Sequence, residues 1–177
     1  MVNPTKHFPK LFMLTTVILV AVDQLVKWHA RTAADWTEGR VYNALIPGIF
    51  ELKLSFNHGI AFGMFQGFGW VFAPVALLIA GWSYNFCAKL PTHFRLLPIT
   101  FGALAAGAIG NLIDRLWMQK VTDMFWFRPI NFPVFNIADS CITVAAIILV
   151  VKGMTEPQEK PQTVAKEAQR DESENSI

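Results

Sequence analysis

The chain has 177 residues, of which 53% are hydrophobic and 16% charged, and its formal net charge is +2. It is therefore more apolar and less charged than an average soluble domain, and its length suits a single domain. The small net charge gives no indication of nucleic-acid binding. Two cysteines, Cys87 and Cys141, each lie within an apolar run. This placement favours buried hydrophobic side chains over a disulfide or a metal site.

Four segments are long and apolar enough to predict membrane-spanning helices. They cover about residues 11–28, 70–88, 96–113 and 137–151. The first could instead be a cleaved secretory signal, because Lys6 and Lys10 precede its apolar run. However, Asp23, Gln24 and Lys27 follow without a clear cleavage site, which favours an uncleaved span. The predicted fold class is a mainly α-helical integral membrane protein with four transmembrane helices.

The basic residues of the short segments predict how these helices are oriented. Lys6 and Lys10 precede the first span, and Lys89 and Arg95 lie between the second and third spans, with no acidic residue beside them. The positive-inside rule places both segments, and hence both termini, in the cytoplasm. The segments of about residues 31–69 and 116–135 then face outward.

The outer segments differ in their patterns. "IFELKLSFN" places Phe50, Leu52, Leu54 and Phe56 on one face of an extended chain, which predicts a small extracytoplasmic β-sheet between the first two helices. The glycine-rich stretch that follows it is typical of a flexible or tightly turned loop. Residues 116–135 are predicted to form a periplasmic loop between the third and fourth helices.

Residues 1–152 are predicted to form one four-helix membrane domain, and residues 153–177 a disordered cytoplasmic tail. From residue 153 onward the chain has six acidic and three basic residues, two prolines and no aromatic residue. Such a composition does not provide enough apolar surface for a packed core.

Most of the unusual polar residues fall at one membrane face in this topology. They lie at the outer end of the first span, the outer end of the third span, the outer loop, and the outer start of the fourth span: Asp23, Lys27, Asn111, Asp114, Arg115, Asp123, Asn136 and Asp139. Ionisable groups near the apolar zone are costly, and by default they indicate a functional site.

Asp123 and Asp139 are the candidates for chemistry. They are sixteen residues apart, and the chain must return to the membrane between them, so the two carboxyls can meet. Two close carboxyls share a proton, and such a pair hydrolyses an amide when one takes a proton from water and the other polarises the carbonyl. His58 is a weaker candidate as the base of a nucleophilic mechanism with a residue such as Ser140. Structural ion pairing remains an alternative for Asp114, and for Asp23 with Lys27.

Five ordered motifs in the chain resemble those of the bacterial lipoprotein signal peptidases, also called signal peptidase II or prolipoprotein signal peptidases. The motifs are "DQLVK" at 23–27, "FNHGIAFG" at 56–63, "GNLIDR" at 110–115, "VTDMF" at 121–125 and "FNIADS" at 135–140. The resemblance implies that Asp123 and Asp139 are the catalytic aspartates. It implies supporting roles for nine further residues: Asp23, Lys27, Asn57, Gly59, Asn111, Asp114, Arg115, Asn136 and Ala138. Thr122 and Ile60 depart from the residues common at their positions.

The resemblance also implies an activity and a location. The substrate is a prolipoprotein whose cysteine carries diacylglyceryl, and an aspartic endopeptidase cuts just before that cysteine without a metal or other cofactor. The implied enzyme is a monomer in the bacterial inner membrane, contacts membrane lipids, and binds peptide-like antibiotics such as globomycin. A proton-coupled transporter and a structural membrane subunit are the alternatives. Against the transporter, the polar residues gather at one face instead of at the midplane.

Overall fold

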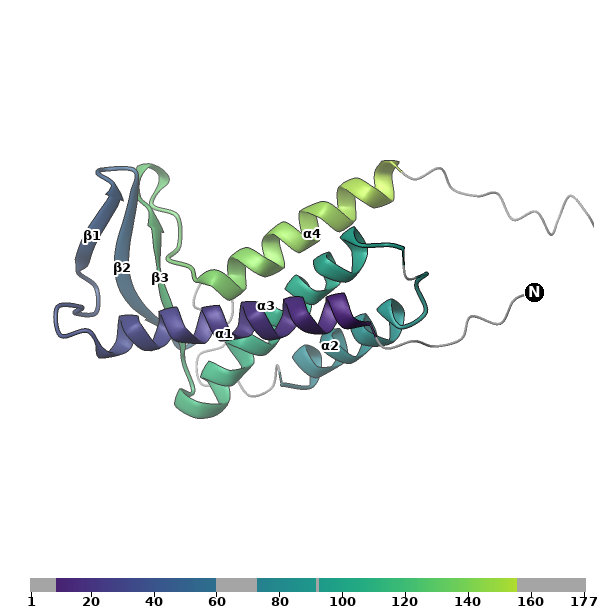
Figure 1. The fold of residues 1–177 in the computed structure, drawn as a ribbon. Helices are drawn as coiled ribbons and strands as arrows, with labels where there is room; N and C mark the ends of the chain where they lie inside the picture. Colours follow the sequence, from purple (N-terminus) through teal and green to yellow (C-terminus); the bar gives the residue numbers. More distant parts are fainter. Residues whose placement is uncertain (1–8, 60–72, 92, 156–177) are drawn as a thin grey trace, which may run out of the picture.

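The computed structural model describes residues 9–59, 73–91 and 93–155. In this part of the chain, four α-helices lie beside one another, and a small β-sheet covers one end of them (Figure 1). Most of the glycine-rich stretch, the first residues of the predicted second span and nearly all of the predicted tail lie outside the described residues.

Three of the described helices are long and apolar enough to cross a membrane: α1 (Lys10–Thr32), α3 (Leu96–Met118) and α4 (Ile137–Thr155). Their mean hydropathies are 1.7, 1.8 and 1.9. Helix α2 (Ala73–Cys87) is apolar but has only 15 residues in the described part of the chain. Three full-length helices and one shorter apolar helix therefore correspond to the four predicted spans.

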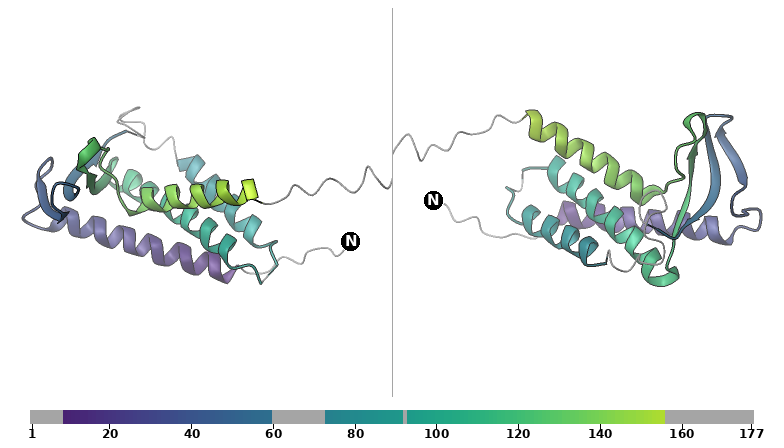
Figure 2. Two further views of the ribbon diagram at one scale, coloured as in Figure 1. Left: turned by 90° about the horizontal axis from the view of Figure 1, so that it is seen from above. Right: turned by 180° about the vertical axis from the view of Figure 1, so that it is seen from behind.

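Helix α3 is the centre of the bundle and packs against α1, α2 and α4 (Figure 2). Glycines make two of these contacts close. A Cβ atom on Gly102 would lie 2.9 Å from the Phe12 carbonyl oxygen of α1. One on Gly107 would collide with the Ala138 carbonyl oxygen of α4 and lie 2.6 Å from Ile142. Small residues thus set the distance between helices, as is usual within membranes.

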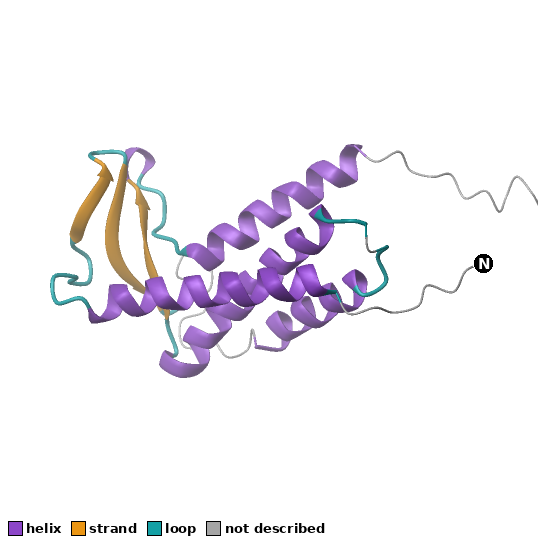
Figure 3. Cartoon of the chain, viewed as in Figure 1, coloured by secondary structure: helices purple, strands orange, loops and turns teal. Residues whose placement is uncertain are grey.

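The sheet has three antiparallel strands in the order β1 (Val41–Ile46), β2 (Phe50–Asn57) and β3 (Val121–Phe127), all at one end of the bundle (Figure 3). The pairing of β1 with β2 agrees with the predicted sheet. Strand β3 does not agree with the loop predicted for residues 116–135. Its first four residues are all buried, so no alternation of apolar and polar residues marks the strand in the sequence.

Strand β2 also departs from the alternation predicted for it. Its buried residues are Glu51 and Leu54, three positions apart, which a regular strand would place on opposite faces. The pairing with β3 passes from Leu52–Phe125 to Ser55–Asp123, so β2 carries one extra residue. This bulge changes which residues share a face along the strand.

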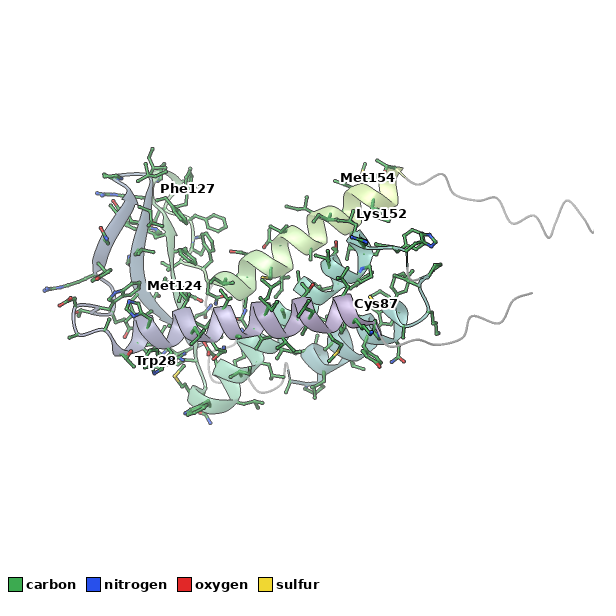
Figure 4. The ribbon with its side chains drawn as sticks, in the orientation of Figure 1. Trp28, Cys87, Met124, Phe127, Lys152 and Met154 are labelled. Atoms are coloured by element: carbon green, nitrogen blue, oxygen red, sulfur yellow. The ribbon has the colours of Figure 1, made fainter. Side chains whose placement is uncertain are left out.

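The two ends of the bundle differ in character. Figure 4 shows Trp28 and Phe127 near the sheet, and Cys87, Lys152 and Met154 at the opposite end. Helix α1 begins and α4 ends at the end remote from the sheet (Figure 1). At the sheet end, α3 stops at Met118, and Gln119 adopts a left-handed conformation with φ of 57° while its N–H bonds to the Arg115 carbonyl. This C-cap turns the chain from α3 into β3 within two residues.

Candidate active site

Asp123 and Asp139 line one cavity of about 410 Å³ at the junction of the sheet and the helices. Asp123 lies in β3, and Asp139 lies in the first turn of α4. The structure thus brings together two carboxyls that come from different elements. The remaining lining residues belong to β2, α4 and the segment before α4: Asn57, Phe132, Pro133, Val134, Phe135, Ser140, Thr143 and Val144.

The start of α4 fixes the position of Asp139. Asn136 precedes the helix, and its Oδ1 accepts the Asp139 N–H at 2.9 Å. In return, Asp139 Oδ2 accepts the Asn136 N–H at 3.1 Å. This reciprocal pair is a capping box with an aspartate in the place of the usual glutamate or glutamine. Asp139 therefore closes the helix start with one oxygen while it faces the cavity.

The side-chain amides of Asn136 and Asn111 together join the two carboxyls. Asn136 Nδ2 donates to Asp123 Oδ1 at 2.7 Å and to Asn111 Oδ1 at 3.1 Å. Asn111 Nδ2 then donates to Asp139 Oδ1 at 2.7 Å. Asn136 is fully buried, so every polar atom of this bridge needs such a partner.

A buried charged group holds Asn111 in its orientation. Lys27 is 0% exposed, and its Nζ donates to Asn111 Oδ1 at 2.9 Å, which turns the Asn111 NH₂ toward Asp139. The same Nζ lies 2.9 Å from Asp23 Oδ2 and 3.4 Å from Asp114 Oδ2. Because a buried ammonium is unfavourable alone, the two carboxylates that flank Lys27 are what make its burial possible.

Asp23 also ties α1 to α4. Its Oδ1 accepts the Ala138 N–H at 3.0 Å, one of the N–H groups at a helix start that have no partner within the helix. The absence of a side chain on Gly110 leaves room for this contact, because a Cβ there would lie 2.6 Å from Asp23 Oδ2. The polar residues of α1 and α3 thus place the N-terminus of α4.

The surroundings raise the pKa of Asp123 to about 7. Burial is the largest cause, since it penalises the charged form, and the negative charge of Asp139 adds to it. The hydrogen bond from Asn136 and the charge of Lys27 act in the opposite direction. At neutral pH, Asp123 is therefore poised to hold or release a proton.

The remaining predicted residues are joined by a short series of contacts that begins at the cavity. Asn57 lines the cavity, and its Oδ1 accepts the Gly59 N–H at 3.0 Å. Arg115 makes long contacts, of 3.5 Å each, to the carbonyl oxygens of Asn111 and Gly59. His58, the alternative base, is exposed and is not among the residues that line the cavity.

Two residues of the polar network were not predicted to have a role. Gln24 Nε2 donates to Asp23 Oδ2, the Gly110 carbonyl and Asp114 Oδ1 at 3.0–3.3 Å. Arg31 contacts Asp114. A signal for Arg31 is present in the sequence, because it lies four residues after Lys27 and continues the helix face that carries Asp23 and Lys27.

Comparison with known proteins identifies the family to which the chain is similar. The family described as "Signal peptidase (SPase) II" matches residues 15–155. The lipoprotein signal peptidase of Symbiobacterium thermophilum is 35% identical over 142 residues, which cover 78% of this chain and 91% of the relative. That of Streptococcus pyogenes serotype M5 is 34% identical and covers 80% and 91%.

Solved structures show the same similarity. A bacterial membrane enzyme determined by the in meso method matches with a TM-score of 0.74 and 28% identity, over 89% of this chain and 98% of the other. A second such structure matches with a TM-score of 0.73 and 27% identity, over 88% and 99%. Together with the apolar helices, these similarities identify a bacterial membrane protein, and the chain belongs to the signal peptidase II family of lipoprotein signal peptidases.

Proposed function

We propose that the protein is an aspartic endopeptidase that cleaves diacylglyceryl-modified prolipoproteins immediately before the lipidated cysteine. The observation that carries the proposal is that Asp123 and Asp139 line one cavity and are bridged by one buried residue, Asn136. Its side-chain Nδ2 donates to Asp123, and its backbone N–H donates to Asp139. Membership of the family supports cleavage of the signal peptide from prolipoproteins. The paired carboxyls support activation of water without a covalent intermediate.

We infer the roles of the two aspartates from their contacts. Asp139 accepts N–H donors on both oxygens, from Asn111 and from the Asn136 backbone, and we assign it as the base. Asp123, whose pKa is raised to about 7, is assigned as the acid. Asp139 takes a proton from water as the water oxygen bonds to the scissile carbonyl carbon, and Asp123 protonates the carbonyl oxygen.

The resulting diol then breaks down by the reverse transfers. The proton on Asp139 passes to the peptide nitrogen of the lipidated cysteine, and Asp123 recovers a proton from one diol hydroxyl. The C–N bond breaks, so the products are the signal peptide with a free carboxyl group and a lipoprotein with a free amino group. The dyad returns to its starting state with one proton.

The cavity's surroundings fit a substrate attached to the membrane. Phe132, Pro133 and Val134 line it on one side, and the half-exposed Val144 of α4 lines it on another. We propose that the sheet end faces outward, with both termini in the cytoplasm and α2 as the second of four spans. A diacylglyceryl group would then hold the scissile bond at the outer boundary of the membrane, level with the dyad. The proposal also includes a monomeric enzyme that contacts membrane lipids and binds peptide-like inhibitors such as globomycin.

The other residues named by the resemblance are proposed as supports. Asn136, Asn111, Lys27, Asp23 and Asp114 form the buried network that holds the dyad. Ala138 contributes its N–H to that network. Asn57 lines the cavity and accepts the Gly59 N–H, and Arg115 contacts the Gly59 carbonyl, so we propose that these three residues contact the substrate backbone.

The test is cleavage of a lipidated precursor by purified enzyme. Asp123→Asn and Asp139→Asn should each lower kcat by at least about 10³-fold, because an amide can neither accept a proton from water nor donate one in the dyad's place. Thermal unfolding in detergent should show that Asp123→Asn remains folded. Asp35→Asn, at an exposed carboxyl outside the cavity, is the matched control and should retain wild-type activity. Near wild-type cleavage by either dyad variant would refute the mechanism.

A further inference from the structure

We infer that Arg31 is a positioning residue that acts through Thr122 and Asp114 to direct Asp123 into the cavity. The inference rests on the proposed dyad. It concerns a residue outside the motifs of the resemblance, and it follows from one guanidinium nitrogen that joins three elements.

Arg31 lies in the last turn of α1, and its Nη1 is the joining atom. It donates to Asp114 Oδ1 of α3 at 3.3 Å and to Thr122 Oγ1 of β3 at 3.1 Å. The Arg31 side chain is 20% exposed, whereas Thr122 is fully buried and Asp114 is 1% exposed. The contact therefore lies at the boundary between the buried network and the surface.

Thr122 is held at two points. Arg31 binds its hydroxyl, and its backbone N–H donates to Asp114 Oδ2 at 3.0 Å. Successive side chains of a strand point to opposite faces, so Thr122 and Asp123 project in opposite directions. Fixing the side chain and the N–H of Thr122 therefore fixes the rotation of β3 about its own axis, and with it the direction of Asp123.

Strand β3 needs such a restraint because of its place in the sheet. Among the described residues it is an edge strand, paired along its length with β2, and on its other side it has one isolated bridge, between Phe125 and Phe135. At Thr122, the contacts from Arg31 and Asp114 take the place of the hydrogen bonds that a neighbouring strand would provide. They come from α1 and α3, the same helices that supply Lys27 and Asn111. The same two helices therefore position both aspartates of the proposed dyad.

Loss of the Arg31 contact should leave the fold intact. Asp114 keeps Lys27 at 3.4 Å on one oxygen and Gln24 at 3.3 Å on the other. The buried Asp114 carboxylate therefore retains both a charge partner and a hydrogen bond. A buried charge that keeps such partners is not left uncompensated, so the protein should tolerate the loss of Arg31. The effect should appear in the chemical step instead of in folding.

The experiment compares four variants with wild type in cleavage of the lipidated precursor: Thr122→Val, Thr122→Ser, Arg31→Met and the double variant Arg31→Met/Thr122→Val. Valine keeps the shape of threonine and removes the hydroxyl, so kcat should fall about fivefold with KM unchanged within about twofold. Serine keeps the hydroxyl and should retain kcat within about twofold. Arg31→Met should resemble Thr122→Val, and the double variant should be little worse than either, because both remove one interaction.

Thr100→Val is the matched control. Thr100 is also a buried threonine, but in the part of the chain that the structure describes its hydroxyl bonds within α3, to the Leu96 carbonyl. It should keep wild-type kcat. Three outcomes would overturn the inference. They are an unchanged kcat in both Thr122→Val and Arg31→Met, equal losses of kcat in Thr122→Ser and Thr122→Val, or losses from Arg31→Met and Thr122→Val that multiply in the double variant. If instead wild type fails to cleave, or the dyad variants remain active, the proposed function fails, which is a separate result.

Discussion

Asn136 has two roles that separate residues usually perform. Its backbone and Oδ1 form the capping box at the start of α4, and its Nδ2 donates to Asp123. A helix cap is normally a local device worth about 1 kcal/mol. Here the same side chain also sets the relative position of the two carboxyls, so the geometry of the site depends on how a helix begins.

The raised pKa of Asp123 predicts a pH-dependent effect on stability. Between its ordinary value of 3.8 and its folded value of about 7, the folded protein keeps a proton that the unfolded chain has lost. Stability supplied by this proton is complete below about pH 4, decreases as the pH rises, and is gone above about pH 7. Asp123→Asn does not titrate and still offers an oxygen to Asn136.

The thermal midpoint of Asp123→Asn minus that of wild type should therefore increase from pH 4 to about pH 7 and level off above it. Unfolding of both proteins in the same detergent, followed across this range, measures the difference. A difference that stays constant with pH would show that burial and Asp139 do not shift this carboxyl.

The meeting of Asp123 and Asp139 at one cavity could be predicted from the sequence, but their partners could be predicted only in part. Carboxyls at the ends of apolar segments stand out because they are costly there. For Arg31 the sequence gives only a weak signal, its place four residues after Lys27 on the same helix face, since an arginine near the end of a helix is ordinary. Its role depends on a strand 91 residues later in the chain, and that distance in sequence hides the contact.

At the scale of elements, the contact between α3 and α4 decides where Asp139 lies. A methyl group on Gly107 would collide with the Ala138 carbonyl, which precedes Asp139 in the first turn of α4. The helices would have to separate, and overpacking of this kind costs about 1–3 kcal/mol. Because Asp139 moves with the helix, activity should fall together with stability.

Gly107→Ala should thus lower the thermal midpoint and reduce kcat at least about tenfold, since small displacements of reacting groups have large effects. Gly81→Ala is the matched control, because a Cβ at Gly81 of α2 meets nothing within 4 Å. Alanine favours a helix more than glycine does, so this control should be as stable as wild type or slightly more stable. Equal effects of the two changes would contradict the close contact.

The helices were easier to predict than the strands. Long apolar runs identify α1, α3 and α4 because lipid imposes a minimum length on a spanning helix. Strand β3 was not predicted, because its residues from Val121 to Met124 are buried on both faces and show no alternation of apolar and polar residues. The bulge in β2 was not predicted either, because it depends on the pairing with β3 and not on the residues of β2 alone.

At the scale of the whole molecule, the proposed orientation can be tested apart from catalysis. In a background without Cys87 and Cys141, a cysteine at the exposed Gln119, near the sheet, should react with an impermeant thiol reagent added to intact cells. A cysteine at the exposed His93, between α2 and α3, should react only after the cells are opened. The reverse pattern would place the cavity on the cytoplasmic side.

The contact between Asp23 and the Ala138 N–H has a consequence for biosynthesis. Helix α1 is synthesised before α4; α1 provides the acceptor, and α4 provides the donor, 115 residues later. Until α4 is inserted, Asn111 lacks Asn136, and the cavity lacks Asp139. A nascent or truncated chain that ends before α4 therefore carries only one of the two carboxyls. The order of synthesis keeps the proposed peptidase inactive until the whole membrane domain has been made.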